Sequence, residues 1–324
     1  MGTRDNVTDI TADAIAIQER DEFREQGWTK LLAPAKVNLY LAIGNRRPDG
    51  YHDAATVLHA INLHDIVYMR RKLEGPDGPD ARIVAQGDVS VPDLPSHDNI
   101  ACKAVLALAR NVGREDDTSF EIRIEKNIPA QAGLGGGSTD AAAALIGAAS
   151  LWGLSPDDPA IEQSARQLGA DVAFFLHGGC TYLEGTGDTF VRSLTPSKRS
   201  IVLVKPNCGV STAEAYRTFD EQPQYASDEY ARIVQTVPTA DDVPLFNNLG
   251  PAANILVPQL GEIKEWLISQ DGISDALLCG SGSCTFALCD SFADACRVVA
   301  EARRKGLWAR ATSFGSAKAM AITS

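Results

Sequence analysis

The clearest hydrophobic pattern near the start of the chain is an alternation with a period of two residues from Lys30 to Ile43. Lys36, Asn38 and Tyr40 fall on one side of this pattern, and apolar residues fall on the other. A period of two is typical of a β-strand, in which successive side chains point to opposite faces. The pattern therefore predicts a strand with one polar face that is available to a ligand.

Further along the chain the pattern predicts helices and strands in mixed order. We expect extended apolar or strand segments at residues 56–69, 119–125, 181–184 and 200–205, and two strands within residues 276–289 around a Gly-Ser-Gly turn. We expect helices at residues 98–110, 138–151, 158–168, 212–219, 252–269 and 291–305, with a turn at 75–80 and a loop at 222–244. Because helices and strands do not alternate regularly, we predict an α+β protein in two parts that meet near residue 195.

Composition narrows the class of protein and of partner. The 324 residues suffice for two domains, and 44% hydrophobic with 22% charged residues is typical of a globular protein. Lys and Arg number 30 against 42 Asp and Glu, which gives a net charge of −12. We therefore expect no general attraction to nucleic acid or to an anionic membrane, so that any bound phosphate is held by local geometry.

The cysteines and the apolar segments predict a cytoplasmic location. The 7 cysteines include no Cys-x-x-Cys pair and no Cys/His spacing typical of a zinc site, so we expect reduced thiols and assign no metal ligands. The longest uncharged apolar stretch, residues 141–154, is shorter than the roughly 18 residues that a membrane span needs. The N-terminal residues also lack the apolar centre of a signal peptide.

A glycine-rich segment, Gly133-Leu-Gly-Gly-Gly-Ser-Thr-Asp140, leads into the alanine-rich helix. Bare backbone N–H groups and the positive end of a helix dipole together predict a site for an anion such as phosphate. We expect Ser138 or Thr139 to cap the helix. The segment is not a Walker motif, because no lysine follows, and Ser138 occupies the place of the last glycine in G-x-G-x-x-G. The alternative is a flexible turn before a helix.

Asp171 and Lys36 are charged residues in apolar surroundings. Asp171 is the only carboxylate between Gly169 and Leu183, and such a group is costly unless it is paired or caps a helix. Lys36 lies in an apolar strand, where the alternative is a lysine at a surface edge. Asn38 shares its face with Lys36, which favours a joint polar site.

Segments that carry these residues resemble, in order, the motifs of a known enzyme family. The segments are Pro34-Ala-Lys-Val-Asn-Leu39, Arg47-Pro-Asp-Gly-Tyr-His52, residues 129–143, Leu168-Gly-Ala-Asp-Val172 and Gly280-Ser-Gly-Ser-Cys284. They resemble the motifs of the 4-diphosphocytidyl-2-C-methyl-D-erythritol kinases of the GHMP kinase superfamily, from about residue 30 to the C-terminus. The glycine segment is a superfamily-level signal, whereas Asp-Gly-Tyr-His and Lys-x-Asn are more specific to this kinase family.

The resemblance implies a two-domain GHMP kinase fold. Residues 1–28 would be an N-terminal extension, residues 29–195 a ribosomal-protein-S5-like ATP-binding domain, and residues 196–324 a ferredoxin-like substrate domain. The implied activity is ATP-dependent phosphorylation of the 2-hydroxyl of 4-diphosphocytidyl-2-C-methyl-D-erythritol, in non-mevalonate isoprenoid biosynthesis. ATP and Mg²⁺ would be the cofactors, and the protein would be a monomer or homodimer with no nucleic-acid or membrane partner.

The resemblance also implies a role for each matching residue. Asp171 would be the general base and Lys36 its electrostatic partner. The ATP-binding residues would be Asn99, Lys103, Pro129, Ala130, Gly133, Leu134, Gly135, Gly136, Gly137, Ser138 and Thr139. Asn38, Tyr51, His52, Thr212 and Tyr216 would hold the cytidine end of the substrate, with Tyr216 stacking opposite Tyr51.

Some features of the sequence leave alternatives open. Asn247-Asn248-Leu249 departs from the usual Asn-Asp-Leu of the family, and Tyr51 could instead pack as an aromatic residue of a turn. We expect His59, His64, His97 and His177 to be structural or surface residues. The alternative functions are another GHMP kinase, such as a homoserine or mevalonate kinase, and a non-catalytic nucleotide-binding protein on the same fold.

Overall fold

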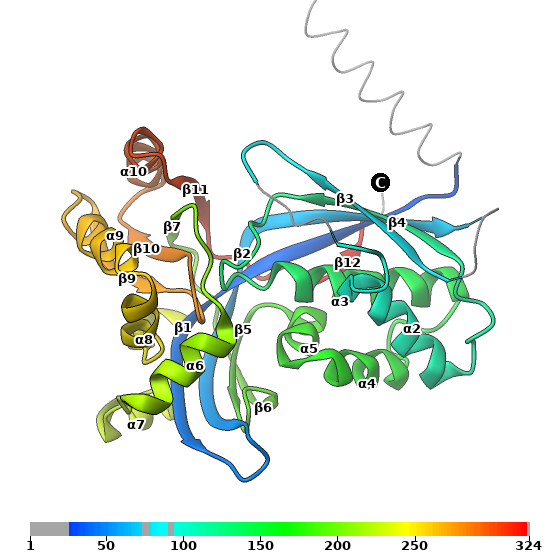
Figure 1. Cartoon of the computed structure of the whole chain (residues 1–324), viewed down its shortest axis with the longest axis horizontal. Coiled ribbons are helices and arrows are strands. Elements are labelled where there is room, and N and C mark those ends of the chain that lie inside the picture. The colour runs from blue at the N-terminus through cyan, green and yellow to red at the C-terminus, as the bar shows by residue number, and fades with distance from the viewer. Residues whose placement is uncertain (1–25, 73–77, 90–93, 323–324) are drawn as a thin grey trace, which may run out of the picture.

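The larger sheet is built around one long antiparallel hairpin. The computed structural model describes residues 26–72, 78–89 and 94–322. Nearly all of the predicted extension and the first half of the predicted turn at 75–80 therefore lie outside the described residues. Strands β1 (Thr29–Arg46) and β2 (His52–Arg71) form the hairpin, which confirms the predicted first strand and lengthens it (Figure 1).

The other strands of this sheet come from both parts of the chain. The main order is β12-β1-β2-β4-β3, β8 also pairs with β1, and β5 joins β2 to β6. Their bounds are β3 (Asp80–Ala85), β4 (Phe120–Lys126), β5 (Cys180–Glu184), β6 (Thr189–Leu194), β8 (Phe246–Asn247) and β12 (Met320–Ala321). The last two strands follow the predicted boundary at residue 195, so the larger sheet is completed by the C-terminal part of the chain.

A β-bulge at Leu39 changes which residues of β1 face the ligand. The pairing passes from Asn38 with Leu58 to Tyr40 with Val57, which leaves Leu39 without a partner. A bulge of one residue reverses the facing of every side chain that follows it. The expectation that Tyr40 shares the polar face is therefore wrong, because Tyr40 is buried in the core.

Four helices cover one face of the larger sheet (Figure 1). They are α2 (Ile100–Val112), α3 (Gly136–Trp152), α4 (Pro159–Leu168) and α5 (Ala170–His177). Asn99 and Asp158 cap α2 and α4 by accepting hydrogen bonds from backbone N–H groups. The predicted capping of α3 by Ser138 or Thr139 is wrong: the helix begins earlier, Gly135 is its N-cap, and no side chain caps it. Its first N–H groups thus lack an internal partner.

The smaller sheet is antiparallel in the order β11-β7-β10-β9. It comprises β7 (Ser200–Lys205), β9 (Ile273–Leu278), β10 (Thr285–Cys289) and β11 (Trp308–Ser313), with α9 (Gln259–Ile268) and α10 (Phe292–Arg304) on one face. Residues Ile201 and Leu203 pack toward the larger sheet, whereas Val202 and Val204 pack against these helices. This order confirms the predicted ferredoxin-like architecture and the α+β class.

The segment between β7 and β9 contains more helix than the pattern predicts. Helix α6 (Thr212–Glu221) is confirmed, but the predicted loop at 222–244 contains α7 (Asp228–Thr236) and a 3₁₀ turn, Ala240–Asp242. The single helix predicted over 252–269 is two helices, α8 (Gly250–Leu256) and α9, with Pro258 between them. Proline disfavours helical geometry at the residue before it, which explains the break.

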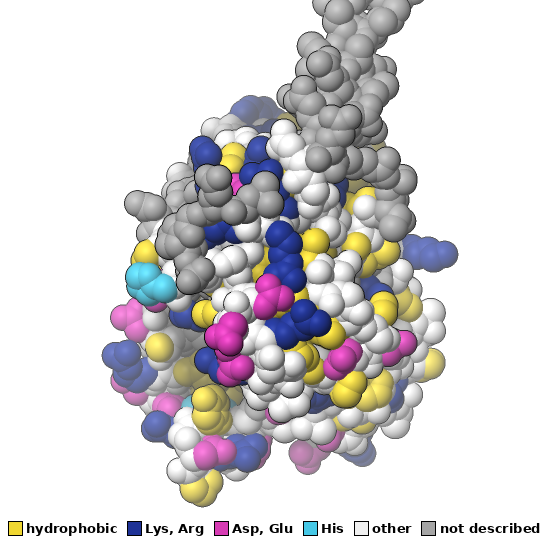
Figure 2. Space-filling view, turned by 90° about the vertical axis from the view of Figure 1, so that its right-hand side faces the viewer, with side chains coloured by type: hydrophobic (Ala, Val, Ile, Leu, Met, Phe, Trp, Pro, Cys, Tyr) yellow, Lys and Arg dark blue, Asp and Glu magenta, His cyan; other side chains and the backbone are white. Residues whose placement is uncertain are grey.

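Figure 2 shows one face of the molecule with its side chains coloured by type. Basic and acidic side chains lie interspersed there among apolar ones. Among the described residues no helix is both long enough and apolar enough to cross a membrane.

Candidate active site

Two cavities lie on opposite sides of the glycine-rich segment. The first, here called the central cleft, has a volume of ≈ 470 Å³ and lies between the larger sheet, α5, α6 and the turn that joins β9 to β10. The second, here called the loop pocket, has a volume of ≈ 320 Å³ and surrounds the start of α3. Gln131, Gly133 and Gly135 border both cavities. A group bound in the loop pocket can therefore meet a group bound in the central cleft.

Lys36 is a buried lysine whose ammonium group faces the central cleft. Its Nζ donates a hydrogen bond to Asn38 Oδ1 at 2.9 Å, and Asn38 Nδ2 donates to Thr56 Oγ1 at 3.0 Å. The backbone N–H of Lys36 donates to the carbonyl of Leu134 in the glycine segment, at 3.0 Å. These bonds fix the ammonium group in one place beside the segment.

Asp171 lies in the first turn of α5 and completes a pair with Lys36. Its Oδ2 lies 3.5 Å from Lys36 Nζ, and the side chain is 38% exposed. Gly169, not Asp171, is the N-cap of α5, so the alternative of a capping aspartate does not apply. A half-exposed carboxylate held by a fixed cation is a group that can accept a proton from a bound molecule.

The glycines let the segment lie close to α5 and to the turn that joins β9 to β10. An added Cβ at Gly133 would lie 1.9 Å from the carbonyl oxygen of Cys279, and one at Gly135 would lie 2.7 Å from the ring of Phe175. Both glycines also have a positive φ, which other residues adopt at a cost. The segment is thus a shaped loop rather than a flexible turn, and it presents the uncapped start of α3 to the loop pocket.

The structure brings most of the predicted ATP-binding residues together. The loop pocket is bordered by Asn99, Pro129, Ala130, Gly133, Leu134, Gly135, Gly136, Gly137 and Ser138. Thr139 does not line the pocket because it is fully buried, and its hydroxyl has no hydrogen-bond partner among the described residues. Lys103 also lies away from the pocket wall, with its ammonium group 3.9 Å from Asp98.

The structure separates the predicted cytidine-binding residues into two groups. Asn38, Thr212 and Tyr216 line the central cleft, but Tyr51 and His52 do not. Tyr51 is 68% exposed on the β1–β2 turn, and its stacking opposite Tyr216 stays a prediction. The ring centroid of His52 lies 5.3 Å from that of Tyr216, and His52 Nε2 lies 2.6 Å from Asp220 Oδ1.

The C-terminal part contributes residues that the sequence reasoning did not assign to the site. Gly280, Ser281 and Gly282 line the central cleft, and Ser281 hydrogen-bonds to Thr212 at 2.9 Å between their hydroxyl oxygens. In the N-terminal part, Gln131 was also not assigned. It borders both cavities and has a φ of 51°, a strained conformation that is concentrated at functional sites. The Gly-Ser-Gly turn and the family resemblance were the only signals for these residues.

Asn248, where the sequence departs from the family pattern, fastens the end of β1. Its Oδ1 accepts from Ile43 N–H at 2.8 Å, and its Nδ2 donates to the carbonyls of Ile43 and Gln224 at 2.8 and 3.0 Å. An aspartate carboxylate could not make the two donated bonds. Asn248 therefore has a structural role in this chain.

A buried ionic cluster at the wall of the loop pocket was also missed, and two of its members, Lys126 and Asp140, line that pocket. Lys126 Nζ donates to Asp140 Oδ2 at 2.7 Å and to Asp65 Oδ2, and Asp65 Oδ1 accepts from the backbone N–H groups of Asn127 and Ile128. The alternation of the predicted strand at 119–125 provided a signal, because Lys126 falls in phase with the buried residues Phe120, Ile122 and Ile124. The same cluster lies close to the glycine segment, since an added Cβ at Gly136 would be 3.2 Å from Lys126 Nζ.

This cluster carries perturbed acids. Burial raises the pKa of Asp140 to about 8, although the charge of Lys126 acts in the opposite direction. Burial also raises the pKa of Asp65. Asp140 Oδ1 has no hydrogen-bond partner among the described residues, so no bond to this oxygen offsets the cost of burying a charge, and burial raises the pKa.

Family models match two segments of the chain, and curated relatives match most of its length. The model for the GHMP kinases N terminal domain matches residues 99–179, and the GHMP kinases C terminal model matches residues 241–306. A 4-diphosphocytidyl-2-C-methyl-D-erythritol kinase of Desulfitobacterium hafniense (strain Y51) is 37% identical over 80% of this chain and 86% of its own length. The enzyme of the same name from Geobacter sulfurreducens is 37% identical over 86% of this chain and 95% of its own length.

Solved structures agree with these matches. The crystal structure of a 4-(cytidine 5'-diphospho)-2C-methyl-D-erythritol kinase is 30% identical, with a TM-score of 0.66, and covers 88% of this chain and 99% of its own. Homoserine kinase from Cytophaga hutchinsonii has a TM-score of 0.65 at 19% identity and covers 91% of this chain and 97% of its own, which shows a shared fold alone. On the sequence identity and coverage of these relatives, the chain belongs to the 4-diphosphocytidyl-2-C-methyl-D-erythritol kinase family of GHMP kinases.

Proposed function

We propose that this kinase transfers the terminal phosphoryl group of ATP to the 2-hydroxyl of 4-diphosphocytidyl-2-C-methyl-D-erythritol across the boundary between the loop pocket and the central cleft. The observation that supports this most is the Lys36–Asp171 pair, which lies directly beside the glycine segment. The reaction serves the methylerythritol phosphate route of isoprenoid biosynthesis. We infer a cytoplasmic enzyme without a nucleic-acid partner.

The acceptor alcohol lies in the central cleft and gives its proton to Asp171. A general base needs to be reachable and unprotonated, and Asp171 is both half-exposed and held 3.5 Å from a lysine ammonium group. Lys36 is fixed by Asn38, so that its charge also stabilises the negative charge of the phosphoryl group during transfer. Both residues act by position rather than by covalent chemistry.

The phosphates of ATP lie against the bare backbone of residues 133–138. The uncapped N–H groups at the start of α3 point at this place, and the helix dipole adds a partial positive charge. Asn99 and residues 129–130 border the outer part of the loop pocket and hold the nucleoside. Lys103 and Thr139 do not line the loop pocket, so we infer that they act through their neighbours.

The donor set at this site fits an Mg²⁺ ion that arrives with ATP. Among the described residues no group of three or more acidic, His or Cys side chains could hold a metal by itself, and Mg²⁺ at kinase sites is bound by one or two protein groups plus substrate phosphates. Asp171 is the one carboxylate among the residues that line the central cleft, and it would hold the ion together with the phosphates. When bound, the ion neutralises phosphate charge.

The cytidine end of the substrate lies toward Tyr216, Thr212 and Asn38. The ring pair of His52 and Tyr216 forms an aromatic wall near this end, and an imidazole can hydrogen-bond the edge of cytosine. Tyr51 joins this wall only if the β1–β2 turn closes over the base, since the turn leaves it exposed here.

An ADP-release assay with a panel of alcohols tests the function. We expect turnover with 4-diphosphocytidyl-2-C-methyl-D-erythritol and no turnover with homoserine or mevalonate. Turnover with one of the latter would assign the chain to another GHMP kinase activity. ATP binding without turnover of any alcohol would favour a non-catalytic protein. Equal inhibition of the kinase by CMP and UMP would contradict recognition of the cytosine edge.

A further inference from the structure

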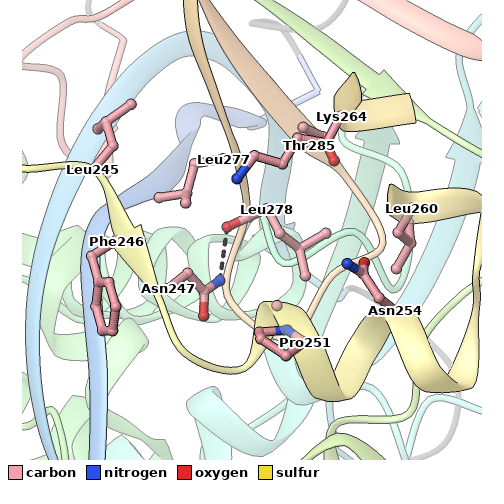
Figure 3. A pocket seen from close by; sticks show the side chains of 11 residues that line it. Leu245, Phe246, Asn247, Pro251, Asn254, Leu260, Lys264, Leu277, Leu278 and Thr285 are labelled. Carbon is pink, nitrogen blue, oxygen red and sulfur yellow. Dashed lines mark hydrogen bonds between the residues drawn. The ribbon is translucent and has the colours of Figure 1, made fainter. Parts of the chain in front are cut away.

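A third cavity lies apart from the central cleft, on the far side of the strands that carry the Gly280–Gly282 turn. It has a volume of ≈ 250 Å³ and lies between α8, α9, β8 and the β9–β10 pair, and we call it the α8–α9 pocket. Figure 3 shows its walls. Most of the lining is apolar and comprises Leu245, Phe246, Pro251, Leu260, Leu277 and Leu278.

Polar side chains also line the α8–α9 pocket, and two of them, Lys264 and Asn254, are exposed to solvent. Lys264, Asn254 and Thr285 line it, and within the described residues none of their side chains makes a hydrogen bond or an ion pair. Thr285 is only 1% exposed, and the side chain of Lys264 extends from α9 across the pocket toward Leu277 (Figure 3). An ammonium, an amide and a hydroxyl group at one apolar cavity are complementary to an anion with an apolar body.

We propose that the α8–α9 pocket is a regulatory site for a short-chain alkyl phosphate monoester. Its volume equals that of roughly eight water molecules at about 30 Å³ each, which suits a chain of about four to five carbons with a phosphate group. Lysine pairs with phosphate as a compact charge, and the separate donors of Asn254 and Thr285 match the several oxygens of phosphate better than the two of a carboxylate. The alkyl chain of the ligand packs against Phe246 and Leu260.

Asn247 connects this pocket with the central cleft. It lines the α8–α9 pocket, and its Nδ2 donates to the carbonyls of Leu278 and Gly280 at 2.8 and 2.7 Å. Gly280 borders the central cleft, and an added Cβ there would lie 3.5 Å from Asn38 Oδ1. A ligand that contacts Leu278 and Asn247 therefore shifts the turn that closes the cleft, and ligands of the two cavities change one another's affinity.

Calorimetric titration of the full chain with pentyl phosphate tests the site. We expect a Kd on the order of 0.1–1 mM, as for a ligand of this size. Lys264→Gln should weaken binding by about tenfold or more, and Lys198→Gln, which changes another exposed lysine, should leave it unchanged. Gly250→Leu should abolish binding by filling the pocket. An added Cβ at Gly250 meets no atom within 4 Å, so this variant should keep its melting temperature.

The comparison ligands and the reciprocal effect make the proposal falsifiable. Inorganic phosphate and pentanol should bind far more weakly, and pentanoate that binds as tightly as pentyl phosphate would overturn the phosphate assignment. Binding that persists in Gly250→Leu, or that ATP displaces in that variant, would place the ligand at the glycine segment and overturn the proposed α8–α9 site.

Saturating pentyl phosphate should also change the KM of ATP or of the alcohol at least about fivefold in the wild type, and not in Gly250→Leu. Unchanged KM values would overturn the regulatory role. The titration does not depend on phosphoryl transfer, so its failure and a failure of the proposed function are separate results.

Discussion

Two lysines flank the glycine segment, and they differ in the water around their carboxylates. Lys36 faces the central cleft and pairs with the half-exposed Asp171, whereas Lys126 lines the loop pocket and pairs with two buried aspartates. Consecutive glycines separate them: an added Cβ at Gly135 would lie 3.2 Å from Lys36 Cγ, and one at Gly136 would lie 3.2 Å from Lys126 Nζ. The same types of side chain thus meet one loop from both sides.

The difference teaches how one ion pair can serve chemistry and another can serve structure. A carboxylate that keeps contact with water can accept a proton from a ligand and release it, at little cost to the fold. A buried cluster cannot lose a member without leaving an uncompensated charge. We therefore expect substitutions around Lys36 to reduce activity and those around Lys126 to reduce stability.

The largest expected effect is that of Asp171→Asn. We expect kcat to fall by about 10² to 10⁴ fold, the range for loss of a positioned general base, with ATP binding and melting temperature retained. Asp157→Asn, which changes an exposed aspartate that lines neither cavity, is the control and should keep activity. Near wild-type turnover of the Asp171 variant would remove this residue from the mechanism.

Lys126→Met should have the next largest effect, and on stability. Breaking a buried pair costs about 3–5 kcal/mol, so the free energy of unfolding in urea should fall by that order. Lys36→Met is the control for loss of an ammonium group at the same loop. It should lose activity with a much smaller loss of stability, because Asp171 remains hydrated. Equal losses of stability in the two variants would contradict the comparison.

Gly137→Val should raise the KM of ATP roughly tenfold, which corresponds to about 1.4 kcal/mol. Gly137 lines the loop pocket, and an added Cβ would be at an ordinary 3.5 Å from Ile100 Cγ2, so the fold should tolerate the change while the phosphates do not. The KM of the alcohol should stay constant. Gly133→Val, which collides with the backbone of Cys279, should instead lower the melting temperature.

A further prediction concerns the pH dependence of stability rather than the effect of a substitution at one pH. The pKa of Asp140 is about 8 in the folded chain and about 3.9 in an unfolded one. The native state therefore keeps a proton that the unfolded state loses, and stability falls as the pH rises from about 4 toward 8, by at most about 1.4 kcal/mol per pH unit. Asp140→Asn should flatten this slope in unfolding curves measured between pH 5 and 8. An unchanged slope would mean that Asp140 is ionised in the fold.

The sequence alone predicts the parts of the site that follow from local pattern and local chemistry. The strand of Lys36 and Asn38, the glycine segment and the isolated Asp171 all have a signal within a few residues. The pairing of Lys36 with Asp171 at 3.5 Å joins positions far apart in the chain, and only the family resemblance indicated this pairing.

What the sequence does not predict depends on long-range geometry. The bulge that buries Tyr40 arises from the register with β2, and the close approach of Gly135 to Phe175 depends on how α5 packs beside the glycine segment. Asp65 and Lys126 meet because β2 and β4 pair, which no local pattern of either segment encodes. The exposed position of Tyr51 follows in the same way from the β1–β2 turn.

The pairing of β1 with β8 and β12 has a consequence for the order in which the fold can form during synthesis. Leu41 pairs with Asn247, and Leu31 pairs with Ala321, so the edge of β1 stays open until these distant residues leave the ribosome. An open strand edge can pair with other chains. Translation that pauses between β7 and β8 should therefore leave a nascent chain in which α2 to α5 can already pack on the larger sheet. The open edge of β1 would still need protection by a chaperone.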